Sequence, residues 1–385
     1  MSSDSLASQI LSVPQGRFQL QRLPKRPREL LQAWDAADEY LLAYADTMLT
    51  ASAINNVLIV NDSFGALAIA LNAYKPEVWS DSYLSQQATQ LNLAGNDISE
   101  LNIRCINSLE VPTKSMQWVF IKVPKTLALL EDQLIKLQPF LTASTQIVVA
   151  GMVKLMPSSI WKLIGRIIGE TTTSLAQKKA RLIFAKPNIK ASYLPNPYPI
   201  RYQLEETEFT IVNHANVFSR DSLDIGTRFF LQHLPINANA RTIVDLGCGN
   251  GVLGLMAAVK NLQAELHFVD ESFMAVASAR ENFYQAFGAS RSVSFHVANG
   301  LESFIEETVD LILCNPPFHQ QNAIGDHIAH SFFKESLRVL SRQGQLWVVG
   351  NRHLNYQQQL SKLFNKTRIV AVNAKFIIWQ AGCQQ

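Results

Sequence analysis

The segment Asn315-Pro316-Pro317-Phe318 contains residue types that can bind a nucleobase. It follows an apolar run, Val309 to Cys314, that is typical of a buried strand, and the two prolines end that strand because neither has an N–H for a ladder. The Asn315 side chain and the Pro316 carbonyl supply two acceptors for one planar amino group. Phe318 supplies a face on which a ring can stack. Since ligands bind at the carboxyl ends of strands in open α/β sheets, the segment predicts a site for a nucleobase amine.

A second segment that can bind a ligand lies earlier in the chain. Asp245 ends a strand-like run, and it is followed by Gly247, Gly249, Asn250 and Gly251 and then by a helical pattern. Alternating glycines let the backbone turn tightly and approach a ligand closely, and the start of the next helix favours a carboxylate. The segment also fits the dinucleotide pattern GxGxxG, so a nicotinamide enzyme is an alternative. An acid at the strand end would repel a pyrophosphate, whereas Asp245 suits the cationic methionine part of S-adenosylmethionine.

Three further polar residues are candidates for binding the rest of such a cofactor. Asp270 ends the strand-like run that begins at Glu265, and one carboxylate there can accept from both hydroxyls of a ribose. Dinucleotide and methyl-donor folds share this acid, so it does not discriminate between them. Glu271 beside it is a candidate that also suits a plain helix start. Asn299 follows another strand-like run, where it could face the adenine or form an ordinary turn.

The candidate residues can form one site only if the fold brings the ends of several strands together. The second half of the chain has the sequence pattern of such a fold. Runs of strand length alternate with longer helical runs, which predicts an α/β fold with a doubly wound parallel sheet. A closing β-hairpin is expected from Thr367 to Trp379. The other elements expected in this half are 242–246, 252–259, 265–269, 273–287, 293–297, 309–314, 332–340 and 345–350.

The first half has a similar but weaker alternation. Its pattern predicts helices at Leu31–Tyr44 and 126–137, and strands at 57–60 and 147–150. Four prolines between residues 187 and 200, with no clear periodicity, mark a linker. The predicted domains are therefore residues 1–190 and 200–385, joined by the proline-rich segment 187–200.

The two halves resemble distant copies of each other. Asp81 and Lys122 match the positions of Asp270 and Asn315, in the same order and at similar spacing, although chance similarity between two α/β halves is an alternative. The glycine alternation is missing from 60–65, and the Lys122 ammonium can only donate hydrogen bonds. We therefore expect the first copy to have lost catalysis, and we expect Lys122 to suit a phosphate.

Composition and charge narrow the class of protein. Of the 385 residues 48% are hydrophobic and 17% charged, which is typical of a globular protein with a sizeable core. The net charge is only +3, but residues 111–190 contain twelve Lys/Arg against three acids. That stretch predicts either a solvated face or a footprint for a phosphate backbone.

The cysteines, the N-terminus and the length of the apolar runs indicate the cellular compartment. The four cysteines are widely spaced, which argues for a reducing compartment and against a zinc site or a disulfide frame. The polar N-terminus does not resemble a signal peptide, and no apolar run reaches the roughly 18 residues that a membrane span needs. We expect a cytoplasmic protein with no metal and no membrane partner.

Taken in order, Asp245–Gly251, Asp270 and Asn315–Phe318 resemble the motifs of class I, S-adenosylmethionine-dependent N-methyltransferases. With the segment 213–228 and the degenerate first half, the chain is similar to bacterial ribosomal RNA guanine-N2 methyltransferases with duplicated domains. Residues 31–44, 123–131 and 213–219 look most like the large-subunit (23S) members. The resemblance implies two tandem Rossmann-like methyltransferase domains, the N-terminal one degenerate, and a pocket bordered by Phe218–Arg228.

The resemblance further implies transfer of a methyl group from S-adenosylmethionine to the exocyclic amine of a guanine in 23S ribosomal RNA, by a protein that we expect to be a monomer. Asn315 Oδ1 and the Pro316 carbonyl would accept the two amine hydrogens and turn the nitrogen lone pair toward the methyl group. Positioning and electrostatics would then supply the rate. The first half would serve RNA binding or act as a scaffold.

Three alternatives stay open from the sequence. One is a guanine-N2 methyltransferase for 16S RNA. Another is a protein glutamine methyltransferase, whose Asn-Pro-Pro motif ends in Tyr; Phe318 and the basic first half disfavour it. The third is a non-catalytic RNA-binding or assembly factor, which would not need the motifs of a methyl-donor pocket.

Overall fold

The computed structural model describes residues 9–26, 29–49, 56–237, 239–317 and 323–382. The chain divides into two compact units, Met1–Pro197 and Tyr198–Gln385, and the boundary lies inside the proline-rich segment 187–200. Each unit contains a seven-stranded sheet and a separate two-stranded hairpin that precedes it in the chain. Phe318 and His319 lie outside the described residues, so the structure does not place the last residue of the Asn-Pro-Pro-Phe segment.

The sheet of the first unit has the order β5-β4-β3-β6-β7-β9-β8. Its first five strands are parallel, and β9 and β8 close the sheet as an antiparallel pair. The strands are β1 (Ile10–Val13), β2 (Gly16–Gln19), β3 (Val57–Val60), β4 (Glu77–Ser80), β5 (Arg104–Asn107), β6 (Trp118–Lys122), β7 (Gln146–Met152), β8 (Thr171–Thr173) and β9 (Ala180–Ala185). The α-helices are α2 (Ala36–Met48), α3 (Ala66–Ala70), α4 (Tyr83–Ala94), α5 (Leu127–Leu137) and α6 (Ser158–Ile167).

The sheet of the second unit has the order β14-β13-β12-β15-β16-β18-β17, and again the last two strands are antiparallel. The predicted closing hairpin is therefore confirmed. The strands are β10 (Ile200–Gln203), β11 (Thr210–Asn213), β12 (Thr242–Leu246), β13 (Glu265–Asp270), β14 (Val293–Val297), β15 (Val309–Cys314), β16 (Leu340–Asn351), β17 (Lys366–Val372) and β18 (Phe376–Gly382). The helices are α7 (Ile225–Leu231), α8 (Val252–Lys260), α9 (Phe273–Phe287), α10 (Ala323–Val339) and α11 (Tyr356–Leu363).

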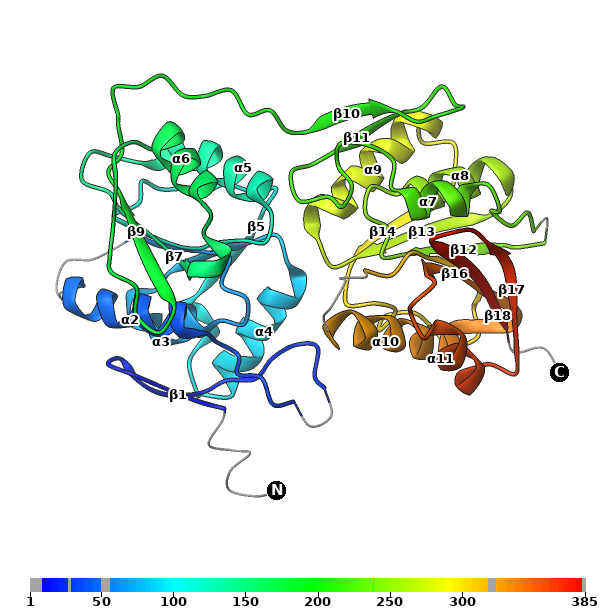
Figure 1. Ribbon diagram of the computed structural model, residues 1–385, viewed down its shortest axis with the longest axis horizontal. Helices are drawn as coiled ribbons and strands as arrows, with labels where there is room; N and C mark the ends of the chain where they lie inside the picture. Colours follow the sequence, from blue (N-terminus) through cyan, green and yellow to red (C-terminus); the bar gives the residue numbers. More distant parts are fainter. Residues whose placement is uncertain (1–8, 27–28, 50–55, 238, 318–322, 383–385) are drawn as a thin grey trace. The chain divides into compact units, whose positions relative to one another are not determined.

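Helices cover both faces of each sheet, as Figure 1 shows for both units. In the second unit one core joins α7, α8 and α9 to the sheet, with Phe229, Phe283 and Phe268 fully or nearly buried. The other face packs α10 and α11 through Phe333 and Tyr356. Because the central strands are buried on both faces, they are apolar throughout, which explains why their sequence runs do not alternate. The doubly wound architecture is thus confirmed, with an antiparallel hairpin added at one edge.

The two sheets have the same strand order, so the predicted duplication is confirmed. Backbone hydrogen bonds set the register: the Asn61 N–H donates to the Trp79 carbonyl, and the Gly247 N–H donates to the Val269 carbonyl. This register corrects one predicted match by a residue. Asp81 corresponds to Glu271, and the first-unit counterpart of Asp270 is Ser80.

Two helix starts differ by five residues or more from those predicted. The helix expected from Leu31 begins at Ala36, because Asp35 and Asp38 form a capping box that fixes its start. Leu31 lies outside the helix and is 53% exposed. Helix α10 begins at Ala323, nine residues before the expected Phe332. The sequence pattern missed this start because Gly325 and polar residues interrupt the apolar period there. Among the described residues no helix is long and apolar enough to cross a membrane.

Candidate active site

The glycine loop between β12 and α8 has the conformation that its sequence predicts. Gly247, Gly249 and Gly251 have φ angles of 71°, 53° and 80°, which L side chains rarely adopt. A Cβ on Gly251 would lie 2.8 Å from Ala279 Cβ, so this glycine is needed for packing against α9. Apart from the two adjacent residues, no heavy atom of the described residues lies within 4 Å of a Cβ built on Gly249, so the loop is open there. The loop can therefore approach a ligand closely at Gly249.

Asp245 is buried under this loop with only one of its two carboxylate oxygens paired. Its Oδ2 accepts from the Gly254 N–H at 2.8 Å, whereas Oδ1 is buried and has no hydrogen-bond partner among the residues that the structure describes. Burial raises the pKa of Asp245 to about 8, and the charge of Asp270 adds to this effect against the Gly254 hydrogen bond. A buried acceptor without a partner is costly, so Asp245 Oδ1 is suited to a group that brings a donor or a positive charge.

The Asp270 carboxylate lies against the same loop. Its Oδ2 accepts from the Gly249 N–H at 3.0 Å, and its Oδ1 accepts from the Ser272 N–H at 3.0 Å. Asp270 therefore fixes the conformation of the glycine loop. It also lies at the end of β13, where the sequence predicts an acceptor for the ribose hydroxyls. Glu271 follows it and is half-buried. Asn299 lies two residues beyond the end of β14, and its side-chain amide donates to Glu302 Oε1.

The Asn250 side chain points away from the loop's open side and ties the loop to the β10–β11 hairpin. Its Nδ2 donates to Asn213 Oδ1 at 2.9 Å and to the Tyr202 hydroxyl at 3.3 Å. Asn282 of α9 strengthens this tie, because its Oδ1 accepts from the Val212 N–H at 2.7 Å and its Nδ2 donates to the Asn250 carbonyl at 2.9 Å. Only the backbone of Asn250 is left to face a cofactor.

Asn315 lies at the carboxyl end of β15, next to the glycine loop. Cys314 pairs with Leu246 across β15 and β12, so Asn315 and Gly247 follow paired residues on neighbouring strands. The Asn315 Nδ2 donates to Thr227 Oγ1 at 3.0 Å and to Asp224 Oδ2 at 3.2 Å. Its Oδ1 is buried and has no hydrogen-bond partner within the described part of the chain. The side chain that the sequence singles out therefore presents an unused acceptor, and Pro316 beside it is buried.

Neither cysteine of this region supplies a nucleophile. Cys248 and Cys314 are buried, and burial raises the pKa of both thiols well above the usual value. The described residues contain no group of three or more His, Cys, Asp or Glu side chains that could hold a metal ion. Hydrogen-bond acceptors and backbone N–H groups are what this site offers.

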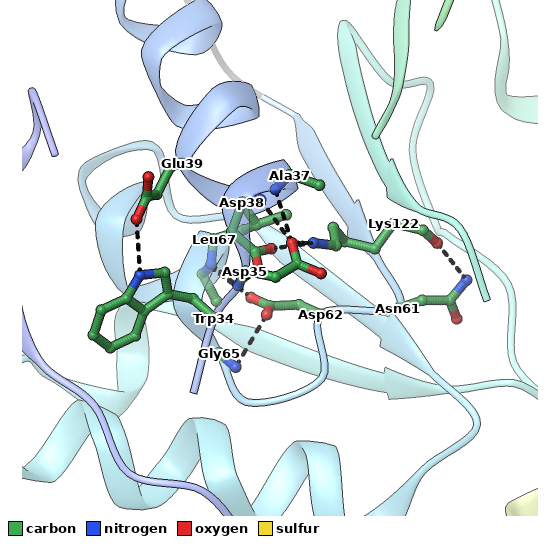
Figure 2. Close-up of polar contacts among 11 residues, drawn as sticks. Trp34, Asp35, Ala37, Asp38, Glu39, Asn61, Asp62, Gly65, Leu67 and Lys122 are labelled. Atoms are coloured by element: carbon green, nitrogen blue, oxygen red, sulfur yellow. Dashed lines mark hydrogen bonds and ion pairs between the residues drawn. The ribbon is translucent and has the colours of Figure 1, made fainter. Parts of the chain in front are cut away.

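The first unit holds charged side chains of its own at the corresponding place (Figure 2). Lys122 occupies the position of Asn315, as predicted, because Ile121 pairs with Val60 as Cys314 pairs with Leu246. Its ammonium lies 2.8 Å from both Asp35 Oδ1 and Asp38 Oδ1. Burial opposes its charge, but these two carboxylates raise the pKa of Lys122 above its usual value.

This pairing corrects the expectation that Lys122 suits a phosphate. The Lys122 side chain is only 13% exposed, and its charge is already balanced by two carboxylates. An RNA phosphate would have to break two short ion pairs within the fold to reach it. Lys122 is therefore part of the internal structure of the first unit.

The loop of the first unit that corresponds to the glycine loop is also hydrogen-bonded from within (Figure 2). The buried Asp62 carboxylate accepts from the Gly65, Leu67 and Ala68 N–H groups at 2.9–3.1 Å. These donors lie at the start of α3, where a helix would otherwise favour the carboxylate of a ligand. In the second unit the residue at the position of Asp62 is Cys248, which does not cap the helix in this way.

Sequence reasoning missed Asp224 and Thr227, which hold the Asn315 amide. They lie within Phe218–Arg228, which the family resemblance places at the pocket, but nothing local marks them as partners of a residue 91 and 88 positions away, respectively. The available signal was the helix start, since Asp224 is the N-cap of α7 and accepts from the Thr227 N–H at 2.8 Å. The same segment carries Phe218, which is 65% exposed.

Comparison with known proteins agrees with this architecture. Residues 8–189 match the family model described as RLMG N-terminal domain, and residues 208–380 match the Methyltransferase small domain. A solved T. thermophilus 16S rRNA N2 methyltransferase, in complex with AdoMet and guanosine, covers 97% of both chains with a TM-score of 0.77. At 20% identity this likeness shows the fold alone.

Two curated relatives are much closer in sequence. A protein of Ectopseudomonas mendocina named ribosomal RNA large subunit methyltransferase G is 47% identical over 97% of this chain and 99% of its own length. A protein of Aeromonas salmonicida with the same name is also 47% identical, over 97% of this chain and 98% of its own. Similarity at this level over nearly the whole of both chains shows the family. The chain belongs to the ribosomal RNA large subunit methyltransferase G family.

Proposed function

We propose that the protein transfers a methyl group from S-adenosylmethionine to the exocyclic N2 amine of a guanine in 23S ribosomal RNA. The observation that carries the proposal is Asn315 Oδ1 at the end of β15, which is buried and has no partner among the described residues. It lies beside a glycine loop that is open at Gly249. The family supports ribosomal RNA as the substrate class, and the names of the relatives support the large subunit.

The residues of the second unit fit S-adenosylmethionine. The unpaired Asp245 Oδ1 matches a ligand that carries positive charge, and the open side of Gly249 leaves room for a ligand against the backbone. Asp270 would accept from the ribose hydroxyls, and Glu271 and Asn299 border the same strand ends. This cofactor supplies an electrophilic methyl group on a sulfonium.

The chain's own contribution is to hold the guanine amine. Asn315 Oδ1 and the Pro316 carbonyl accept the two N2 hydrogens, which turns the nitrogen lone pair out of the ring plane and toward the methyl group. Positive charge develops on this nitrogen as its bond to the methyl carbon forms and the carbon–sulfur bond breaks, and one of the two N2 protons is afterwards lost to solvent. An acceptor fixed beforehand therefore stabilises the transition state more than the bound substrate. Phe318 is proposed as the stacking face for the base.

The first unit is proposed to be a degenerate methyltransferase domain that has lost catalysis and contacts RNA. Exposed lysines lie at the carboxyl end of its sheet: Lys125 follows β6, Lys154 follows β7, and Lys179 lies in the turn before β9. The Val153 N–H donates to the Lys179 carbonyl at 2.8 Å, which holds the last two of these segments together. A cluster of this kind suits a phosphate backbone.

The test is methyl transfer from radiolabelled S-adenosylmethionine to separated 16S RNA, 23S RNA, 30S and 50S subunits, followed by nucleoside analysis. We expect N2-methylguanosine in 23S RNA or 50S subunits. Label in 16S RNA would favour the small-subunit alternative, and label on any atom other than N2 would refute the role of Asn315. The 23S and 50S arms separate naked RNA from the assembled subunit, and gel filtration tests the expected monomer.

A further inference from the structure

The start of α7 determines which end of the Asn315 amide faces the pocket. Asp224 and Thr227 are the N-cap and the third residue of this helix, and both present oxygen atoms to Asn315 Nδ2 at 3.2 and 3.0 Å. A carboxylate can only accept hydrogen bonds, so the amide must turn its NH₂ group toward Asp224. The carbonyl oxygen, Oδ1, is thereby turned to the other side.

The direction of this amide matters for the proposed chemistry. With Oδ1 toward the substrate, Asn315 accepts a hydrogen from the guanine amine. After rotation by half a turn about its terminal bond, the same side chain would present two donors to an amine that already carries two hydrogens. The terminal amide torsion is broad and has two roughly equivalent minima, so the backbone does not choose between them.

The first unit supplies independent support for this arrangement. Asp35 is the N-cap of α2 and Asp38 is the third residue of that helix, and both accept from Lys122, the counterpart of Asn315. The same two helix positions therefore carry acceptors in both copies, and in both copies they bind a donor at the end of the fourth parallel strand. In the first unit the two acceptors are present although their partner is a lysine and no amide has to be oriented. Accepting hydrogen bonds from a donor at the end of the neighbouring strand is therefore a property of this helix start in both units.

We propose that Asp224 and Thr227 are positioning residues for methyl transfer, which hold the Asn315 amide with Oδ1 toward the guanine amine. They do not touch the reacting atoms. This inference rests on the proposed function, because it assigns the two residues a role only if Asn315 accepts from the amine.

The test compares two double variants of the full-length chain that differ in whether oxygen atoms remain in reach of Asn315. In Asp224→Ser with Thr227→Val, the serine still caps α7, since serine and aspartate are similar N-caps, but it is too short to keep the bond to Asn315. The valine keeps the shape of threonine and lacks its hydroxyl. In Asp224→Asn with Thr227→Ser, a carbonyl oxygen and a hydroxyl can occupy the original positions.

Single-turnover methyl transfer to a 23S RNA transcript is measured beside the dissociation constants for S-adenosylmethionine and RNA. We expect the Ser/Val pair to lower the rate constant by about tenfold to 10²-fold. This is less than the roughly 10²–10³-fold typical of deleting one oriented polar group, because Asn315 itself is retained. Both dissociation constants should stay within about threefold of wild type. The Asn/Ser pair should recover most of the rate.

The inference is overturned if the Ser/Val pair transfers methyl within about threefold of wild type. It is also overturned if the Asn/Ser pair is equally slow, or if cofactor affinity falls in parallel with the rate, because the loss would then reflect disruption of α7. Failure of the proposed function is distinguishable from all of these, since it appears in the wild-type protein as the absence of N2-methylguanosine.

Discussion

Asp245 is the single residue whose protonation should report cofactor binding. Burial raises its pKa to about 8, far above the usual value for an aspartate, so the ligand-free carboxyl holds a proton at neutral pH. A cationic ligand favours the ionised form. Affinity for S-adenosylmethionine should therefore rise with pH from about 6 to 7.5, by up to tenfold per pH unit. Calorimetric titrations across this range measure the effect.

Asp245→Asn is the matched control, because it removes the titrating group and preserves the shape. The variant should bind more weakly at pH 7.5 and show a flat pH profile. The ligand-free protein should respond in the opposite sense. Because the folded-state pKa lies above the unfolded one, wild-type stability falls as pH rises from about 4 toward 8, and the variant should lose this slope. A wild-type affinity that does not change with pH would contradict the assignment of Asp245.

A second prediction for a single residue concerns the contribution of Asp270 to cofactor affinity. Asp270→Ala should weaken S-adenosylmethionine binding by about 1–3 kcal/mol, because the ribose hydroxyls lose their acceptor and the Gly249 N–H loses its partner. Glu265→Gln is the control, since it changes an acid at the opposite end of the same strand and leaves the loop contact intact. Equal affinity of wild type and the folded Asp270→Ala variant, measured by calorimetry, would remove Asp270 from the cofactor site.

At the scale of elements, Lys122 joins the end of β6 to the start of α2. The ammonium lies between Asp35, which caps the helix, and Asp38, which completes the capping box. Lys122→Met leaves both carboxylates without their cation, and removing one partner from a buried pair typically costs about 3–5 kcal/mol. We expect urea unfolding of the first unit to shift to lower concentration by a corresponding amount. Lys125→Met, at an exposed position three residues on, should change stability by less than about 0.5 kcal/mol.

The same experiment decides between the two interpretations of this lysine. If Lys122 contacted RNA phosphates, Lys122→Met would lower RNA affinity and leave the unfolding midpoint unchanged. That outcome would reinstate the phosphate role that its sequence position suggests and that its two ion pairs in the structure contradict.

Element prediction from sequence succeeded where burial on both faces made strands uniformly apolar. The strands at 57–60, 242–246 and 309–314, which are largely buried, were placed to the residue. The strand at 293–297 was also placed to the residue, although it is only half-buried and contains Ser294 and His296. Element prediction failed at α2 because the apolar Leu31 and Trp34 extend the helical period beyond a start that Asp35 sets by hydrogen bonding. The Asn315 segment could be found because two prolines after a buried strand are unusual, whereas its partner Asp224 is brought to it only by the packing of α7.

At the scale of the whole molecule, the duplication extends beyond the seven-stranded sheets. Asn92 of α4 accepts from the Gln21 N–H and donates to the Gln21 and Phe64 carbonyls. Asn282 of α9 makes the same set of bonds to the hairpin and loop of the second unit. Each copy therefore includes its hairpin, its capped helix and this asparagine. The two copies differ in what occupies the site at the strand ends. In the first unit Asp62 and Lys122 occupy it and are paired within the fold. In the second unit Asp245 Oδ1 and Asn315 Oδ1 have no partner among the described residues.

If the first unit meets RNA, its exposed lysines should account for part of the salt dependence of binding. Lys125, Lys154 and Lys179 lie at the carboxyl end of its sheet, and Lys122 is excluded because it is paired internally. Each phosphate contact contributes about 0.7–0.9 to the slope of log affinity against log salt. Replacing the three lysines by glutamine in the full-length chain should reduce the slope by about 2–3 in filter-binding measurements with 23S RNA.

A matched triple variant separates this local effect from the loss of three charges in general. Lys334, Lys362 and Lys366 are exposed lysines of the second unit, on α10, α11 and β17. Their replacement by glutamine changes the net charge equally and should leave the slope nearly unaltered, because they do not lie at the carboxyl end of either sheet. Affinity for S-adenosylmethionine should stay at the wild-type value in both variants. Equal slopes for the two triple variants would mean that the first unit does not contact the RNA backbone through these lysines, and its role would then be that of a scaffold.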